Sequence, residues 1–541
     1  MTRHVRRGTP WRVRTTLGGV HSQVFGTDVA LQKTMTLSAL RKVASLLVIL
    51  CASLTLAQDS RPPLAPEAST SGKSAAELLA GRELGSTPML DDLRELCDAI
   101  GGRPTGSKAC DRAVDWAVGR FKAAGVDAVW TESYTLAQTW SGGADYAECL
   151  SPVQFPVRVA SSPSTVPTPN GQPLEARLVN AGEGTPEAFA HLGERARGAV
   201  ALVLSPEMKT EADLFAEYER DGPLLVAAEK AGVAALLLQS THSHLLLYRH
   251  PLALGAETIR IPSAVVAREH AARLARLAEQ GEVRLRLDLP SRTGGPTEAR
   301  NVIAEIRGRE KPEEIVLMGA HLDSWDLGTG AEDDGVNAVM LIDIARSLKT
   351  LGLTPRRTLR FALFTGEEQG MLGSEAYVLR HTQEIGRHVA MIAFDTGSGR
   401  LTGFYLNGRE DLRRPVDEAL APVAGMGVSD HTLEAIDGTD NFDFLLSGIP
   451  NLIGRQEWAP YLPNYHAESD VYDVVNGPQA RMNAAIASVL AWGFAEQPAS
   501  PAPRQTRDEV EQLLRANKLD EQMKGLGQWE DWKAGKRGVS K

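Results

Sequence analysis

From about Asn301 onward, the chain alternates short apolar runs with longer amphipathic stretches. The apolar runs have the length of buried strands, whereas the amphipathic stretches have the periodicity of helices. This pattern predicts strands at Ile315–Gly319, Thr358–Phe364 and Val389–Phe394, and helices at Val336–Leu351, Gly373–His381 and Arg414–Ala424. Alternating strands and helices are typical of a parallel sheet covered on both faces. We therefore predict an α/β fold, a three-layer sandwich with a central mixed, largely parallel sheet.

An earlier segment has the same mixed character. Helical periodicity runs from about Ser74 to Ile100, and Ser107 has the position of an N-cap for a helix that extends to about Ala124. Alternating polar and apolar residues at Asp127–Tyr134 predict a strand. We assign residues 76–164 and 292–495 to two parts of one domain.

The region between these two parts begins with a change in composition. Residues 152–172 are rich in Pro, Ser and Thr, and a Pro- and Gly-rich stretch follows at 289–296. Between them the pattern predicts strands at Gly198–Leu204, Ala234–Gln239 and Ile261–Val266, and helices at Leu224–Ala231 and Glu269–Gln280. We predict a small inserted α/β domain at residues 165–291.

The N-terminal region has the character of a targeting segment. Arg41 and Lys42 precede the uncharged apolar run Val43–Leu56, and Ala57 comes before a polar stretch. This order is typical of a secretory signal, and the run is shorter than a membrane-spanning helix of roughly 20 residues. We expect translation to start at Met35, cleavage near Ala57, no stable membrane span afterwards, and a secreted or periplasmic protein. An uncleaved membrane anchor is the alternative.

Two further segments complete the expected domain organisation. Residues 1–57 are the N-terminal extension and signal, and residues 58–75 are a flexible leader rich in Pro, Ser and Ala. Residues 496–541 start with a Pro-rich linker and continue as a charged, helix-like tail.

Charge and cysteine content narrow the possible partners. The formal net charge is −10, and residues 1–42 hold eight of the basic residues but only one acidic residue. The remaining acidic body would repel nucleic acid, so we expect no nucleic-acid partner. Of the four cysteines, Cys97 and Cys110 flank a Gly-rich turn, where they either form a disulfide bond or remain free thiols.

The candidate chemistry lies at or just after the predicted strands of the second part. In chain order the candidate metal ligands are His321, Asp333, Glu368, Asp395 and His466. The carboxyl ends of strands in open α/β sheets are where active sites form. Two imidazoles and three carboxylates suit two zinc ions that share a bridging carboxylate, and such a pair activates water for hydrolysis.

Neighbouring carboxylates extend this set. Asp323 lies two residues after His321, where it could accept the second N–H of a metal-bound imidazole. Glu367 precedes Glu368, so one side chain can bind metal while the other faces the substrate water as a general base.

Several motifs resemble the co-catalytic zinc exopeptidases of metallopeptidase family 28. The similarity covers about residues 85–150 and 296–495, and the insert resembles a protease-associated domain. The motifs that carry the resemblance are Gly319–Trp325, Gly330–Gly335, Gly438–Asp440, Gly448–Pro450 and Tyr465–His466.

This resemblance implies a cofactor of two zinc ions and a role for each ligand. One ion is held by His321 and Asp395, the other by Glu368 and His466, and Asp333 bridges the two.

The resemblance also implies three further roles near the metals. Glu367 is the general base, Asp323 orients His321, and Tyr465 donates a hydrogen bond to the oxyanion of the tetrahedral intermediate.

The expected activity is hydrolysis of the terminal peptide bond of peptides or dipeptides, and we expect an aminopeptidase. The alternatives are a carboxypeptidase Q-like dipeptidase, a receptor-like relative without activity, and a di-zinc amidohydrolase or glutaminyl cyclase-like enzyme. The sequence places neither the acidic group that would bind an α-amine nor the cationic group that would bind a carboxylate. It also leaves the oligomeric state open.

Overall fold

The structure is a computed structural model that describes residues 73–254 and 259–540. Its first sheet has seven strands, and the strands at its centre, β14, β13, β15 and β17, run parallel to one another. The outer strands pair antiparallel. In spatial order the strands are β1 (Ala128–Leu136), β12 (Thr297–Ile306), β14 (Arg357–Phe364), β13 (Lys311–His321), β15 (His388–Ala393), β17 (Asn451–Gln456) and β16 (Leu401–Tyr405).

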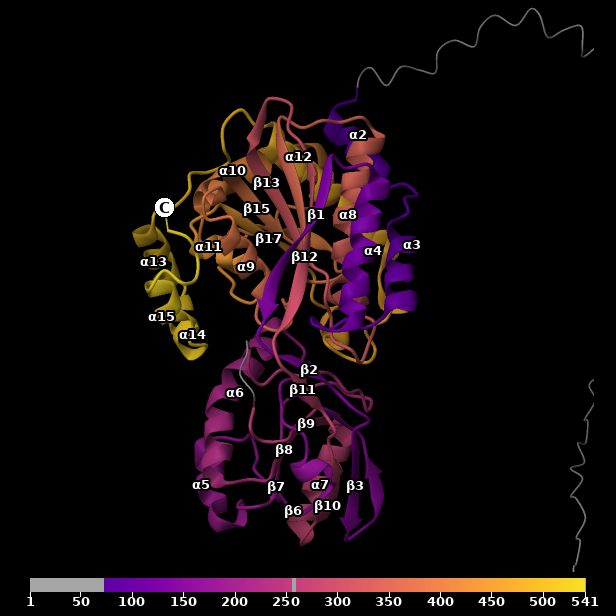
Figure 1. The fold of residues 1–541 in the computed structure, drawn as a ribbon, viewed down its shortest axis with the longest axis vertical. Helices are drawn as coiled ribbons and strands as arrows, with labels where there is room; N and C mark the ends of the chain where they lie inside the picture. Colours follow the sequence, from indigo (N-terminus) through magenta and orange to yellow (C-terminus); the bar gives the residue numbers. More distant parts are fainter. Residues whose placement is uncertain (1–72, 255–258, 541) are drawn as a thin grey trace, which may run out of the picture. The chain divides into compact units, whose positions relative to one another are not determined.

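Helices cover both faces of this sheet (Figure 1). The larger apolar core joins one face to α2 (Ala75–Glu83), α3 (Met89–Glu95), α4 (Lys108–Ala124), α8 (Val336–Thr350), α10 (Arg413–Leu420) and α12 (Gly477–Glu496). A second core joins the other face to α9 (Leu372–Arg380) and α11 (Phe442–Leu446). The predicted α/β class with a mixed sheet is therefore confirmed, although only the central strands are parallel.

Local sequence explains where the first helices begin and end. The Ser107 hydroxyl accepts a hydrogen bond from the Cys110 amide and caps α4, as predicted. The helical stretch predicted from Ser74 to Ile100 is interrupted, because α2 ends at Glu83 and α3 begins only after Pro88. Proline lacks the amide hydrogen that would continue the first helix, so the chain turns and starts a second one.

A second sheet of eight strands lies in the middle of the sequence. Its spatial order is β4 (Phe155–Val157), β3 (Tyr146–Ser151), β10 (Arg284–Asp288), β6 (Leu174–Asn180), β7 (Val200–Val203), β8 (Ala235–Gln239), β9 (Ser263–Val266) and β5 (Val159–Ser161). The helices of this region are α5 (Pro186–Leu192), α6 (Glu211–Ala231) and α7 (Arg268–Gln280). At its two ends in the sequence, β2 (Thr139–Ser141) and β11 (Arg292–Gly294) pair in a separate two-stranded ribbon. We call residues 139–294 the insert.

Strands β3, β4 and β5 precede residue 165, the expected start of the insert, yet they pair with strands of the second sheet. Cys149, Phe155 and Val157 are buried in its core. The Pro- and Ser-rich composition of residues 152–172 concealed β4 and β5, because three-residue strands at sheet edges carry little periodicity.

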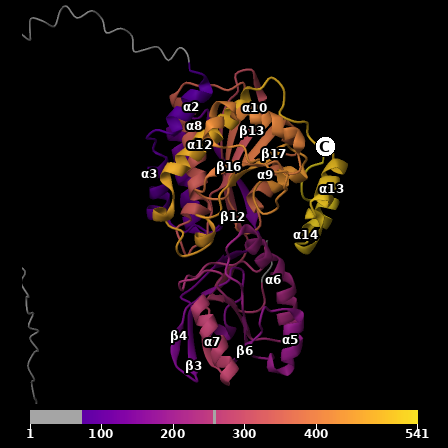
Figure 2. The same ribbon diagram turned by 180° about the vertical axis from the view of Figure 1, so that it is seen from behind.

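The segment expected as a linker and charged tail contains three helices, α13 (Arg507–Ala516), α14 (Leu519–Gly525) and α15 (Gln528–Lys533). Both views place them beside the sheet domain on the side of α9 and α11 (Figures 1 and 2). Trp532 packs with Phe442 and Leu446 of α11, and Arg537 forms a bidentate, buried ion pair with Asp443. The tail therefore shares a core with the sheet domain.

Some expectations concern residues 1–72, which lie outside the described residues. They include the extension, the signal segment with its start at Met35 and cleavage near Ala57, and most of the leader. Among the described helices, none combines the length and apolar character needed to cross a membrane. Cys97, Cys110 and Cys149 are buried free thiols, so Cys97 and Cys110 are not joined.

Replacing Trp532 with alanine should lower the free energy of unfolding by about 3–5 kcal/mol, the usual cost of truncating a fully buried aromatic side chain. Trp532 is 1% exposed. Chemical denaturation followed by circular dichroism measures this change. Lys536→Ala, at a side chain that is 72% exposed, is the matched control and should change stability by less than about 0.5 kcal/mol. Equal stabilities for the two variants would contradict the shared core.

Candidate metal centre

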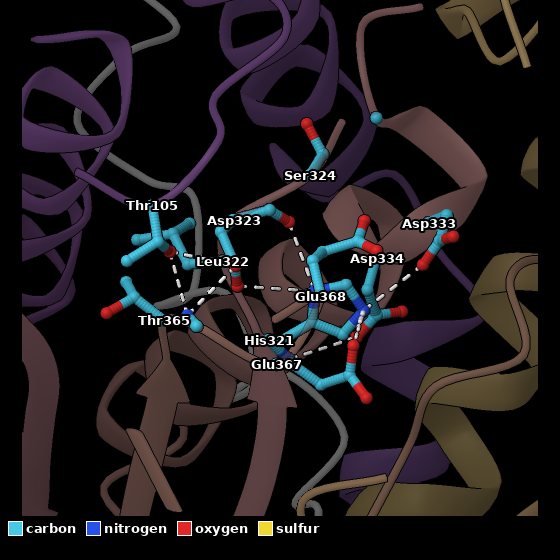
Figure 3. Close-up of polar contacts among 12 residues, drawn as sticks. Thr105, His321, Leu322, Asp323, Ser324, Asp333, Asp334, Thr365, Glu367 and Glu368 are labelled. Carbon is cyan, nitrogen blue, oxygen red and sulfur yellow. Dashed lines mark hydrogen bonds and ion pairs between the residues drawn. The ribbon is translucent and has the colours of Figure 1, made fainter. Parts of the chain in front are cut away.

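Adjacent parallel strands deliver most of the predicted ligands to one edge of the sheet. His321 is the last residue of β13, Glu368 follows β14, and Asp395 follows β15. Asp333 lies in η4 (Ala331–Gly335), and His466 follows η8 (Leu462–Asn464) in the loop after β17. Because parallel strands end at the same edge, residues far apart in sequence meet there. Figure 3 shows His321, Asp333 and Glu368 gathered at this edge.

The structure brings all five predicted ligands together as two histidine–carboxylate pairs that are linked by Asp333. His321 Nε2 is 3.1 Å from Asp333 Oδ1 and 3.2 Å from Asp395 Oδ1. His466 Nε2 is 2.8 Å from Glu368 Oε2 and 3.4 Å from Asp333 Oδ2. Each oxygen of Asp333 thus faces a different imidazole, so this carboxylate connects the two pairs.

The other ring nitrogen of each histidine shows how the imidazoles are protonated. Nδ1 of His321 lies 3.1 Å from the carbonyl oxygen of Asp323, and Nδ1 of His466 lies 3.0 Å from that of Arg249. A carbonyl oxygen only accepts hydrogen bonds, so each Nδ1 carries a hydrogen. In the neutral rings, Nε2 then presents a lone pair to carboxylate oxygens, an arrangement that is favourable only if a proton or a metal ion lies between the two atoms.

The distances between these atoms suit such a cation. Two ligand atoms at about 2.0–2.1 Å from one tetrahedral zinc ion lie about 3.3 Å apart, close to three of the four separations above. A cavity of about 10 Å³ is lined by Asp333, Glu368, His466 and Trp325. It has room for about one water-sized sphere.

The electrostatics of the site also favour a bound cation. Burial by itself would lower the pKa of His321, but Asp395 and the other nearby carboxylates raise it well above its ordinary value. Burial raises the pKa of Glu368 to about 7, although His466 opposes the shift. The negative field that favours protonated imidazoles would equally favour divalent cations.

Asp334, which the sequence left without a role, also lies in this cluster. One ligand atom each from His321, Asp334 and Asp395 fall within 4.8 Å of one another, as do those from His321, Asp333 and Glu368. However, Asp334 Oδ2 accepts the His321 amide at 3.2 Å and Oδ1 accepts the Asn337 side chain at 2.6 Å. Because both oxygens already have donors, we interpret Asp334 as a support for the end of β13.

Glu367 projects toward the same centre from a turn that requires glycine. Gly366 has φ +79°, and a Cβ there would lie 2.5 Å from the Tyr134 hydroxyl. Glu367 Oε2 is 4.0 Å from His321 Nε2, and its side chain retains 13% exposure. Burial and the Asp395 carboxylate raise the pKa of Glu367 well above its usual range. The structure therefore places a partly accessible carboxyl group beside the ligands.

Asp323 connects His321 to the turn that carries Glu367. Its Oδ2 accepts the Thr105 hydroxyl at 2.8 Å and the Gly366 amide at 2.9 Å (Figure 3). Its Oδ1 lies 3.6 Å from His321 Nδ1, farther than the backbone carbonyl of the same residue. The hydrogen bond that orients the imidazole therefore goes to the backbone carbonyl of Asp323, and the carboxylate oxygen is too distant to share it.

Tyr465 lies next to the ligands but also meets the insert. Its ring stacks on that of His466, with centroids 3.7 Å apart. Its hydroxyl is 2.8 Å from the hydroxyl of Tyr218 in α6.

Two supporting residues escaped the sequence analysis. The Asp470 carboxylate accepts the backbone amides of Ala331, Glu332 and Asp333 at 3.0, 2.7 and 3.2 Å. The fully buried Arg103 donates to the carbonyls of Leu322, Thr329 and Gly330. Their partners are backbone atoms, which leave no signature in the sequence. The one available signal was that Asp470 lies four residues after His466 in the sequence.

Comparisons with known proteins place this geometry in context. A profile of Peptidase family M28 matches residues 301–491. Carboxypeptidase Q of Mus musculus is 30% identical over 410 residues, which cover 74% of this chain and 84% of that protein. The crystal structure of a Peptidase M28 precursor from Shewanella amazonensis superposes with a TM-score of 0.72 at 28% identity, covering 80% of this chain and 98% of that one. A zinc aminopeptidase from Bacillus subtilis shares the fold, with a TM-score of 0.60 at 19% identity, covering 77% and 97%.

Replacing Asp470 with asparagine should weaken binding of a divalent metal by about 10-fold, the lower end for partners that orient ligands. An amide has one accepting oxygen, so its NH₂ group would face one of the three backbone amides and displace η4. Titration with Zn²⁺ against a chromogenic chelator measures the affinity. Asp473→Asn, at an exposed position nearby, is the control and should bind metal like the parent protein. Unchanged affinity for Asp470→Asn would show that η4 needs no such support.

Proposed function

Because this chain belongs to Peptidase family M28, we propose that it is a di-zinc exopeptidase that removes residues from the amino end of peptides. The family predicted from the sequence is confirmed, and so is its assignment as a metallopeptidase. The observation that carries the finer proposal is the Asp333 carboxylate, whose two oxygens face two different imidazoles.

We assign His321 and Asp395 to one zinc position, Glu368 and His466 to the other, and Asp333 to both. The donor set fits zinc, since imidazole nitrogens and carboxylate oxygens are its usual ligands besides thiolates. When bound, the metal pair would acidify a water molecule and polarise the carbonyl of the scissile bond.

The side chains around the metals then handle the protons. Glu367 takes the proton of the attacking water and later delivers it to the leaving amine. Asp323 holds His321 in place through the contacts described above. The Tyr465 hydroxyl donates a hydrogen bond to the oxyanion that develops on the substrate.

The charge of the site favours a substrate with a free amino end. Carboxyl groups crowd the centre, since Glu367 and Asp440, which are not among the proposed ligands, interact electrostatically with each other and with Asp395. Within residues 73–254 and 259–540, Asp333, Glu368 and Asp395 form ion pairs with histidines and with neither lysine nor arginine. A positively charged α-amine would be attracted here, whereas a C-terminal carboxylate would lack a cationic partner.

A carboxypeptidase Q-like dipeptidase is the second candidate. It is favoured by the 30% identity that extends over 84% of mouse carboxypeptidase Q. A receptor-like relative without activity is disfavoured, because the ligand set is complete and converges. We further propose that the insert is a protease-associated domain and that the segment Val43–Leu56 directs the protein out of the cytoplasm.

Replacing Glu367 with glutamine should reduce kcat for peptide hydrolysis by roughly 10²–10⁴-fold, the usual contribution of a general base. Folding and zinc content should stay near those of the parent, because Glu367 is not among the proposed ligands. Hydrolysis rates, circular dichroism and metal analysis of the same samples check this result.

The matched control is Glu313→Gln, at an exposed position on β13 away from the ligands, and it should retain full activity. Loss of a general base costs at least about 10²-fold in rate. If Glu367→Gln kept more than about a tenth of the parent rate, a group other than Glu367 would therefore have to take the proton.

One dipeptide in free, N-acetylated and C-amidated forms distinguishes the two candidate functions. An aminopeptidase should cleave the free and amidated forms and leave the acetylated form intact, because acetylation removes the positive charge of the α-amine. A dipeptidase that needs both ends should cleave neither blocked form. Chromatographic analysis of the products identifies the bond that is cut, and cleavage of the acetylated form alone would exclude the aminopeptidase proposal.

A further inference from the structure

The insert contributes directly to the surroundings of a proposed metal ligand. The Arg249 amide donates to the His466 carbonyl at 3.0 Å, and His466 Nδ1 donates to the Arg249 carbonyl at 3.0 Å. Tyr248 forms an antiparallel bridge with Ala467, and the Glu468 amide donates to the Leu247 carbonyl at 3.0 Å. A short stretch of the insert thus pairs with the loop that carries His466.

This pairing matters because the backbone of His466 is in an unfavourable conformation. Its φ is +55°, in the left-handed region that side chains with a Cβ rarely occupy. Such a conformation persists only where surrounding contacts hold it. The contacts on both sides of His466, its carbonyl and its ring, come from the same residue of the insert.

Arg249 is itself anchored by its side chain. Its guanidinium donates to both carboxylate oxygens of Asp326 at 2.7 and 3.1 Å. It also donates to the Ser161 carbonyl at 2.7 Å and lies over the Trp140 ring, 5.1 Å from the centroid. Arg249 is 3% exposed. The side chain therefore ties the backbone of residue 249 both to the insert and to the loop after β13.

The residue before His466 is held by the insert as well. His242 Nε2 lies 3.1 Å from the Tyr465 carbonyl, and the Tyr218 hydroxyl lies 2.8 Å from the Tyr465 hydroxyl. His242, Tyr218 and Arg249 thus support two consecutive residues of the loop from three points of the insert.

We infer that the insert completes one of the two metal positions, and that Arg249 is the positioning residue that orients His466 through its backbone carbonyl. This inference rests on the proposed di-zinc function. It assigns the insert a role in metal binding at the position of His466 and Glu368, and none at the position of His321 and Asp395.

The test compares zinc binding by the full chain with that of Arg249→Met, which removes the guanidinium and keeps much of its volume. Competition with a chromogenic chelator gives the affinity of each position. We expect one affinity to fall by about 10-fold or more, the usual effect of losing a ligand's outer partner, and the other to stay unchanged. Asp326→Asn removes the carboxylate that pairs with the Arg249 guanidinium and leaves the core of the insert intact. It should therefore weaken zinc binding at the same metal position as Arg249→Met. Thermal unfolding of the metal-free variants checks folding.

A second background shows which position is affected. His466→Ala should leave only the position of His321 and Asp395, and adding Arg249→Met to it should not change the affinity of that remaining position. A merely structural role of Arg249 would weaken this position too, and that result would overturn the inference. The matched control is Arg158→Met, which breaks another ion pair between the insert and the loop, at Glu468, and should leave both affinities unchanged.

The outcomes separate the two proposals. If the parent protein bound no zinc, the proposed function itself would fail. If the parent bound two ions and Arg249→Met and Asp326→Asn bound both equally well, only the role of Arg249 and the insert would be refuted.

Discussion

The structure depends on one electrostatic constraint, the concentration of buried carboxylates around two imidazoles at the end of a sheet. Asp333, Glu368 and Asp395 lie within about hydrogen-bonding distance of the Nε2 atoms of His321 and His466. Such a cluster is costly in a protein interior unless cations compensate it. The two ring nitrogens that point away are already bonded to carbonyl oxygens, so the remaining nitrogens are left for metal.

The surrounding chain holds this cluster largely through backbone atoms. Arg103 binds the carbonyls of the loop after β13, and Asp470 binds the amides of η4. Asp323 ties the end of β13 to the Gly366 turn. Each of these residues is ionisable and buried, and each fixes a segment that carries or adjoins a proposed ligand or the proposed base. Precise placement of ligands therefore comes from a set of buried charges whose partners are peptide groups.

Two segments outside the sheet domain, the insert and the C-terminal helices, pack against loops of the proposed site. The insert pairs with the loop of His466 through residues 247–249. The C-terminal helices pack on α11 and on Met371, a few residues after Glu368. Segments that sequence composition marks as a separate domain and a tail are thus packed against the loops that form the site.

The sequence by itself determined the α/β class, the order of the ligands and the family, because these depend on residue types placed at strand ends and on local periodicity. It also located the Ser107 cap, since capping is a local interaction. The break at Pro88 is also local, because proline cannot continue a helix, whereas the pairing of β3 to β5 and the packing of the tail helices on α11 were decided by distant segments. So were the contacts of Arg103, Asp470 and Arg249, because they reach backbone atoms, and every residue has the same backbone. Only the tertiary structure could show which of those peptide groups lie within reach of these side chains and of His466.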